Sequence, residues 1–192
     1  IGKTGLGYIR TRVFEAVAKV GSEREILTPE MINGLVEEGH ALRIFKRKHQ
    51  IDALLVQILV EGEDKRFYST PDGLVMKKEL QLQGGGIEYE ASTVEVKCYA
   101  PSKFMSCVLC ESVEEIKKVD PGAFWQSVDQ IVNTGCPDGY LVYFNPSMPE
   151  KYGYKEFHLR PMEIWKDIKL LKDRKALALK LFDEMYKKLT QQ

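Results

Sequence analysis

Hydrophobic residues near the start of the chain recur at the spacing that lines one face of a helix. They are Ile9, Val13, Val17 and Val20. This pattern predicts a first helix over residues 8–20. Thr28 and Pro29 predict the start of a second helix, because threonine caps free N–H groups and proline suits the first turn. The second helix is expected to end near Lys48 and to bury Met31, Ile32, Leu35, Leu42 and Phe45.

The middle of the chain carries the patterns of strands and turns. Residues 51–60 are almost continuously aliphatic and predict a mostly buried strand. The polar residues 61–64 predict a turn, and residues 66–70 predict the returning strand of a hairpin. Further strands are expected over residues 74–76, 87–98, 140–144 and 154–159, with the glycines at 84–86 as a flexible tip.

The second half of the chain has mainly helical patterns. A short segment after Pro101 places Val113 and Ile116 on one face. Residues 121–134 predict a helix that Gly135 ends. A long amphipathic helix is expected over residues 163–189, with an inner face of Trp165, Ile168, Leu171, Leu179, Phe182 and Met185. This order predicts a single α/β domain over residues 1–192, with a mixed central sheet flanked by helices.

Composition narrows the classes of protein. Hydrophobic residues make up 44% and charged residues 29%, as in ordinary globular domains. Lysine plus arginine equals aspartate plus glutamate at 28 each, which argues against a protein that merely coats DNA by neutralising phosphates. The chain shows no apolar run long enough for a bilayer and no signal peptide. We therefore expect no membrane partner and a cytoplasmic location.

The four cysteines occur at positions 98, 107, 110 and 136. Cys107 and Cys110 form a C-x-x-C, but a zinc site would need a second pair at similar spacing. The spacing does not suit a four-cysteine iron–sulfur cluster either. We therefore expect reduced, scattered thiols.

The segment V-E-V-K at positions 94–97 alternates hydrophobic and charged residues. In a strand, Glu95 and Lys97 therefore project to one side and the two valines to the other. Asp72 lies where another strand breaks, at a kink fixed by Pro71 and Gly73. If the two strands are neighbours, Asp72 and Glu95 converge within a few ångströms.

Converging carboxylates suggest a metal site. Two carboxylates held together repel each other unless a cation neutralises them, and hard oxygen ligands favour Mg²⁺ or Mn²⁺ over zinc. The backbone carbonyl of Val96 is a candidate third ligand. Such a metal polarises a phosphoryl oxygen and activates a bound water, and Lys97 can orient or deprotonate that water or stabilise charge on the phosphate.

Each of these motifs alone is weak evidence. A P-D-G segment is usually only a turn, and an E-x-K is common as a solvated ion pair on the surface of a strand. Their specificity comes from their order along the chain and from the hairpin expected between them.

The pattern P-D, then about twenty residues, then E-x-K resembles the PD-(D/E)xK nuclease superfamily. More closely, the chain resembles the YqaJ-like viral recombinases, the family of phage lambda exonuclease. The matching segments occur in the family's order from position 6 to about 150. They are L-G-Y-I at 6–9, G-L-V-E-E at 34–38, S-T-P-D-G-L at 69–74, E-V-K-C at 95–98, F-W-Q at 124–126 and Y-F-N-P-S-M at 143–148.

This resemblance implies a restriction-endonuclease-like core with an active centre of known layout. Asp72 and Glu95 would be metal ligands, with Lys97 as the catalytic lysine. Glu38 on the early helix would support the metal, and Glu37 is its rival one residue away.

The resemblance also assigns a glutamine and leaves other positions open. Gln126 would complete the site. Val128 stands at the second glutamine of the family's Q-x-Q, and nearby Gln130 is expected to face another direction. Arg10 and Arg12 are candidates for a 5′-phosphate contact only through their place beside the N-terminal motif. The interval between Asp72 and Glu95 is longer than in lambda exonuclease.

The family's activity gives the functional expectation. It is a Mg²⁺- or Mn²⁺-dependent exonuclease that hydrolyses linear double-stranded DNA from the 5′ end. The setting would be viral or prophage recombination in a bacterial or virus-infected cell, with a single-strand annealing protein as partner and a trimer as the assembly. The alternatives are a restriction-type or structure-specific endonuclease on the same fold, and a DNA-binding or assembly protein that no longer cuts.

Overall fold

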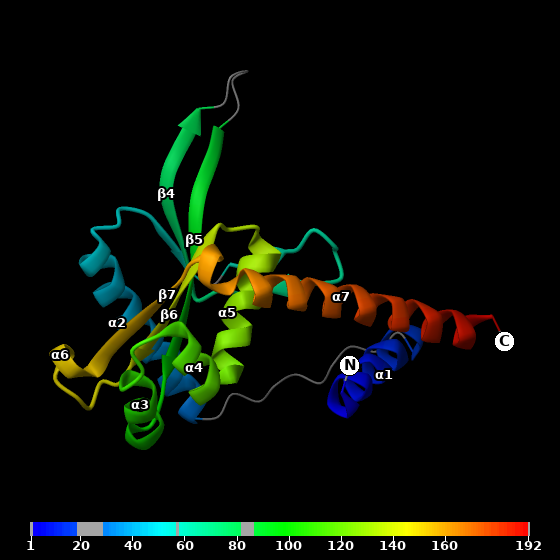
Figure 1. The fold of residues 1–192 in the computed structure, drawn as a ribbon, viewed down its shortest axis with the longest axis horizontal. Helices are drawn as coiled ribbons and strands as arrows, with labels where there is room; N and C mark the ends of the chain where they lie inside the picture. The colour runs from blue at the N-terminus through cyan, green and yellow to red at the C-terminus, as the bar shows by residue number, and fades with distance from the viewer. Residues whose placement is uncertain (1, 19–28, 57, 82–86, 192) are drawn as a thin grey trace. The chain divides into compact units, whose positions relative to one another are not determined.

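The computed structural model describes residues 2–18, 29–56, 58–81 and 87–191 (Figure 1). The helices of this part of the chain are α1 (Lys3–Ala18), α2 (Pro29–His49), α3 (Pro101–Val108), α4 (Val113–Val119), α5 (Pro121–Thr134), α6 (Glu150–Gly153) and α7 (Pro161–Thr190). The strands are β1 (Leu54–Val56), β2 (Val60–Glu61), β3 (Tyr68–Ser69), β4 (Gly73–Gln81), β5 (Ile87–Cys98), β6 (Asp138–Phe144) and β7 (Tyr154–Leu159).

The chain divides into two compact units. Thr28–Trp165 forms one, here called the sheet unit, and Ile1–Leu27 with Lys166–Gln192 forms the other, the helical unit. Helix α7 begins in the sheet unit and continues in the helical unit. The single-domain organisation of residues 1–192 stays a prediction.

The sheet unit is built around a five-stranded sheet in the order β1-β4-β5-β6-β7. Strands β5 and β6 are parallel, and the other neighbours are antiparallel. Strands β2 and β3 form a separate small hairpin. Figure 1 shows α2 and α5 on opposite sides of the central strands. The predicted class, a mixed sheet flanked by helices with a long C-terminal helix, is confirmed.

The core between α2 and the sheet follows from the period-two pattern of β5. Val94 and Val96 point toward α2, where they join a buried cluster with Leu42 and Phe45. Burying each such side chain contributes roughly 1.5–3 kcal/mol, so this layer holds β5 in register against the helix. Because Val94 and Val96 face α2, the residues between and after them must face the opposite side of the sheet.

Several local predictions match the structure. Helix α5 begins at Pro121 and ends before Gly135, whose φ of 69° is in the left-handed region that glycine adopts without strain. Strands β5 and β7 have the predicted bounds, whereas β4 runs on to Gln81. The hairpin expected from a strand over residues 51–60 and a returning strand over 66–70 is present only as the short pair β2 and β3.

The helices near the start of the chain are also found. Helix α1 begins at Lys3, earlier than expected, and buries Ile9 and Val13 but leaves Val17 exposed. Leu42 and Phe45 of α2 are buried as predicted. The other predictions here lie outside the described residues or side chains: Val20, Thr28, the tip at 84–86, and the burial of Met31, Ile32 and Leu35.

Two predictions of burial are wrong. The aliphatic residues 51–60 were expected to form a mostly buried strand, but β1 covers only Leu54–Val56. Leu55 and Val56 of this edge strand are exposed, and so is Leu59, which follows the strand. Trp165 is also exposed, and its neighbour Ile164 is the buried residue.

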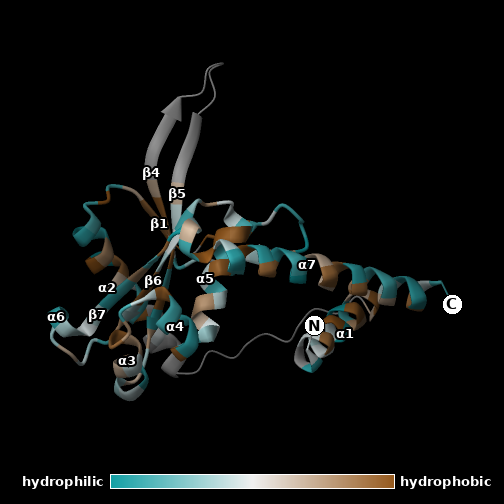
Figure 2. Cartoon of the chain, in the orientation of Figure 1, coloured by the Kyte–Doolittle hydropathy of each residue, from teal (hydrophilic) through white to brown (hydrophobic). Residues whose placement is uncertain are grey.

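Helix α7 is amphipathic, as predicted. Hydrophobic and hydrophilic residues alternate along it (Figure 2). Within the described residues, no helix combines the length and the hydrophobicity that crossing a bilayer requires.

Candidate active site

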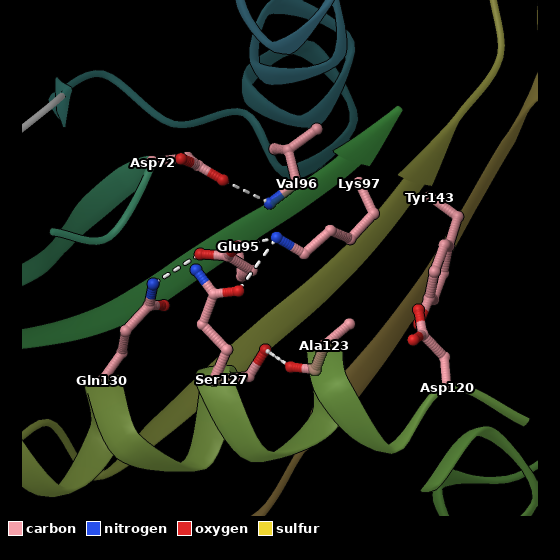
Figure 3. Close-up of polar contacts among 10 residues, drawn as sticks. Asp72, Glu95, Val96, Lys97, Asp120, Ala123, Ser127, Gln130 and Tyr143 are labelled. Carbon is pink, nitrogen blue, oxygen red and sulfur yellow. Dashed lines mark hydrogen bonds and ion pairs between the residues drawn. The ribbon is translucent and has the colours of Figure 1, made fainter. Parts of the chain in front are cut away.

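Strand β5 brings a carboxylate and an amine to the face that α5 covers. Glu95 and Lys97 project toward α5, opposite to the two valines that face α2 (Figure 3). Glu95 is only 1% exposed, so its carboxylate is removed from bulk water. Burying a charge without partners is strongly unfavourable, so the contacts of this carboxylate decide what it can do.

Asp72 reaches the same place from the residue before β4. Gly73 pairs with Val94, which places Asp72 beside Glu95. The Oδ2 atom of Asp72 accepts a hydrogen bond of 2.7 Å from the backbone N–H of Val96. Glycine at position 73 lets the start of β4 pack closely here, because a Cβ there would lie 3.0 Å from Leu54 Cδ1 and 3.2 Å from Leu42 Cδ2.

The acidic groups repel one another and so raise their pKa values, as the sequence led us to expect. Burial, followed by repulsion from Glu95, raises the pKa of Asp72 to about 7, although the hydrogen bond from Val96 opposes the shift. Burial and repulsion from Glu95 also raise the pKa of Glu38. A bound cation would relieve this repulsion and favour the charged carboxylates.

Lys97 is held between two acceptors. Its Nζ lies 2.5 Å from Glu95 Oε1 (Figure 3). The same Nζ lies 3.0 Å from Gln126 Oε1. Gln126 is exposed on α5, so the amine lies at the border between the buried carboxylate and solvent. The structure therefore brings Gln126 to Lys97, and its role in completing the site stays a prediction.

Gln130 is the residue that sequence reasoning misplaced. It was expected to face away from the site, but its Nε2 donates a hydrogen bond to Glu95 Oε2. The spacing contained the necessary signal: positions four apart in a helix lie on one face, so Gln126 and Gln130 point the same way. Val128, which stands at the family's second glutamine, is buried in the core instead.

The structure also separates the two candidate glutamates of α2. Glu38 interacts electrostatically with Glu95, Asp72 and Lys97. Glu37 instead lies 3.1 Å from His40 Nδ1 on its own helix. The geometry therefore favours Glu38 over Glu37 as the acidic residue that α2 contributes.

The donor set suits a hard cation. Asp72 and Glu95 offer carboxylate oxygens, the ligands that hard cations prefer. The part of the chain that the structure describes contains no group of three His, Cys, Asp or Glu side chains arranged around a metal position. The backbone carbonyl of Val96 as a third oxygen ligand stays a prediction.

The candidate phosphate-binding arginines and the four cysteines each have a defined local setting. Arg10 and Arg12 belong to the helical unit, where Arg12 pairs with Glu15 at 2.8 Å and lies over the ring of Tyr8. Their role as phosphate contacts stays a prediction. All four cysteines are free thiols. Burial and the nearby Glu38 raise the pKa of Cys98 to about 12, which opposes thiolate chemistry beside Lys97.

Comparison with solved structures places this site in a known fold. No protein-family model and no curated protein matches the chain. An alkaline exonuclease from Laribacter hongkongensis, LHK-Exo, superposes with a TM-score of 0.70 at 17% identity, over 99% of this chain and 85% of the exonuclease. The chain shares the fold of this exonuclease.

A second structure of the same exonuclease, in complex with dAMP, gives a TM-score of 0.66 at 17% identity. The match covers 97% of this chain and 83% of the exonuclease. At this level of identity the likeness establishes the fold. The activity of the chain has to be argued from its own residues.

Proposed function

We propose that this protein is a metal-dependent nuclease that hydrolyses phosphodiester bonds of DNA. The observation that carries the proposal is the meeting of Asp72, from the residue before β4, with Glu95 and Lys97 of β5. Surface ion pairs do not account for it, because Glu95 is buried and Asp72 is drawn into the same electrostatic cluster. The shared fold with an exonuclease supports the proposal.

The chemistry follows from the groups present. Asp72, Glu95 and the carbonyl of Val96 would hold Mg²⁺ or Mn²⁺, which when bound stabilises charge on phosphoryl oxygens and lowers the pKa of water. Lys97 Nζ lies beside Glu95 and can orient the attacking water or stabilise the charge that develops on the phosphate. Water adds to phosphorus, the P–O ester bond breaks, and the leaving oxygen takes up a proton.

The finer proposal is an exonuclease that digests linear double-stranded DNA from the 5′ end. It rests on the sequence motifs and on the alkaline exonuclease that shares the fold. The motifs also support Glu38 and Gln126 as further members of the site. A role in viral or prophage recombination, with a single-strand annealing protein as partner, belongs to the same proposal.

The decisive experiment is digestion of 5′-phosphorylated linear duplex in Mg²⁺ by the wild type, Lys97→Ala and Lys118→Ala. Lys118 is an exposed lysine of α4 and serves as the matched control. We expect the wild type and Lys118→Ala to degrade the duplex, and Lys97→Ala to lose most of the activity. If the wild type is as inert as Lys97→Ala, the nuclease proposal is wrong; if both cut equally, the role of Lys97 is wrong.

Two further substrates separate the forms of the proposal. Closed circular duplex stays intact with an exonuclease, whereas an endonuclease nicks it. Duplexes labelled at the 5′ or the 3′ end give the polarity, because the label at the attacked end is released first.

A further inference from the structure

Helix α5 presents two glutamines to the two charged groups of β5. Gln126 accepts a hydrogen bond from Lys97, and Gln130, one turn later, donates one to Glu95 (Figure 3). Gln126 is exposed, but Gln130 is only 2% exposed. A polar side chain this deeply buried is unusual unless its hydrogen bonds are satisfied.

The orientation of the Gln130 amide follows from its partner. An ionised carboxylate only accepts hydrogen bonds, so Nε2 must face Glu95 and Oε1 must point away. In that orientation Oε1 is buried and has no hydrogen-bond partner among the described residues. Since an unpaired buried carbonyl is unfavourable for folding, the fold gains little from this glutamine apart from its contact with Glu95.

The two donors reach different oxygens of the same carboxylate. Lys97 Nζ contacts Glu95 Oε1, and Gln130 Nε2 contacts Glu95 Oε2. A glutamate side chain can rotate about its terminal bond, but donors on both oxygens fix the plane of the carboxylate. The Gln130 donor is carried by the middle of a helix rather than by a loop, so its position is well defined.

We propose that Gln130 is a positioning residue that orients the Glu95 carboxylate for metal binding. The inference rests on the proposed function, since it assumes that Glu95 is a metal ligand. Partners of metal ligands that hold them by hydrogen bonds typically change metal affinity about 10–100-fold when they are replaced. Gln130 needs no contact with DNA or with the reacting atoms to have this effect.

The test is direct titration of Mn²⁺ in the absence of DNA, followed by electron paramagnetic resonance of the free ion. The variants are Gln130→Met, which keeps the volume but not the donor, and Gln130→Asn, which keeps the amide but shortens its reach. We expect both to bind Mn²⁺ about 10–100-fold more weakly than the wild type. Ser127→Ala is the matched control, because the buried Ser127 hydroxyl donates its hydrogen bond to Ala123 O of its own helix, and it should bind as the wild type does.

Circular dichroism checks the fold of each variant, and one measurement avoids variants altogether. In wild-type protein the ¹⁵N side-chain amide resonance of Gln130 should shift as Mg²⁺ is added. The reason is that the Glu95 carboxylate, which accepts the hydrogen bond of this amide, then also coordinates the cation. An unshifted resonance at saturating Mg²⁺ would overturn the inference even if both variants failed to fold.

The outcomes also distinguish this inference from the proposed function. If the wild type neither binds Mn²⁺ nor degrades DNA, the nuclease proposal fails. If the wild type does both, and folded Gln130 variants bind Mn²⁺ with wild-type affinity, only the role of Gln130 is wrong. An equal loss of affinity in Ser127→Ala would also overturn it, since any change in α5 would then have the same effect.

Discussion

The backbone N–H of Val96 donates a 2.7 Å hydrogen bond to Asp72 Oδ2 and so ties the start of β4 to β5. This bond stabilises the charged form of Asp72, yet burial and the repulsion from Glu95 outweigh it and raise the pKa to about 7. Asp72 therefore binds its proton more tightly in the folded protein than in the unfolded chain, where the pKa is about 3.9.

The first prediction concerns the pH dependence of the metal-free protein. The stability that the Asp72 proton contributes is complete below the unfolded pKa and is lost as pH rises through about 7. In EDTA, the Tm of the wild type should therefore fall as pH is raised from 5 to 8. Asp72→Asn keeps the shape and the acceptor for Val96, so its Tm should depend less on pH over this range.

Differential scanning calorimetry at several pH values makes this measurement. Asp52→Asn, at an exposed aspartate, is the control and should follow the wild type. Parallel curves for the wild type and Asp72→Asn would show that Asp72 does not titrate in this window.

Structural features that depend on nearby residues could be predicted from the sequence, whereas features that depend on distant pairings could not. The bounds of α5 follow from Pro121 and Gly135. The side of the sheet that each β5 side chain faces follows from the alternation of hydrophobic and charged residues, so both could be predicted. The burial of residues 51–60 could not, because it depends on β1 being at the edge of the sheet, and strand order is set by distant pairings.

The candidate site shows the same division. Asp72, Glu95 and Lys97 could be named from their motifs, and the structure brings them together. Gln130 does not follow from the Q-x-Q motif, because that motif spaces its glutamines two residues apart, whereas a helix repeats about every 3.6 residues. Once α5 is placed over β5, the residue four positions after Gln126 meets Glu95.

The second prediction concerns the packing of β6 under α5. A Cβ at Gly139 would lie 2.4 Å from Thr93 Oγ1 and 3.0 Å from the Ile131 side chain. Gly139→Ala should therefore destabilise the protein by about 1–3 kcal/mol, as overpacking of a tight core does. Urea unfolding measures the change.

Gly122→Ala is the matched control for this substitution. Gly122 lies in the first turn of α5, where a Cβ would meet only Asp120 Oδ1, at 3.9 Å. Alanine there should be neutral or stabilising by roughly 0.5–1 kcal/mol, because it reduces the freedom of the unfolded chain. Equal effects of the two substitutions would refute the close approach of Gly139 to β5.

The third prediction concerns Glu156 on β7, which three neighbours contact. Tyr154 OH donates a hydrogen bond of 2.6 Å, His49 Nε2 lies at 3.1 Å and Lys48 Nζ at 3.2 Å. Burial alone would raise the pKa of Glu156, but these hydrogen bonds and charges lower it below its ordinary value. The resulting stability is present above the unfolded pKa and is lost as pH falls through the folded pKa.

Glu156→Gln should therefore cost roughly 1–3 kcal/mol at pH 7, and the difference from the wild type should shrink toward pH 3. Guanidinium unfolding at both pH values measures this. Glu150→Gln removes the exposed partner of Arg47 and should cost no more than about 1 kcal/mol. A difference that stays constant down to pH 3 would mean that the charge of Glu156 is not the source of the stability.

The last prediction concerns the two glutamines of α5: Gln126 should affect kcat, and Gln130 should affect the affinity for Mn²⁺. Gln126 Oε1 accepts a hydrogen bond from Lys97 Nζ at 3.0 Å, whereas Gln130 Nε2 donates its hydrogen bond to Glu95 Oε2. Gln126→Met should lower kcat about 10–100-fold, because a hydrogen bond to a charged group is worth about 1.5–3 kcal/mol and each 1.4 kcal/mol is a factor of ten in rate.

Mn²⁺ affinity should stay close to the wild-type value in Gln126→Met, since the carboxylate keeps both of its donors. Steady-state digestion of linear duplex at saturating Mg²⁺ gives kcat, and titration without DNA gives the affinity. Unchanged kcat would show that Lys97 does not depend on Gln126 for its placement. A fall in Mn²⁺ affinity equal to that of the Gln130 variants would mean that α5 acts on the site as one body, rather than through two amides with separate targets.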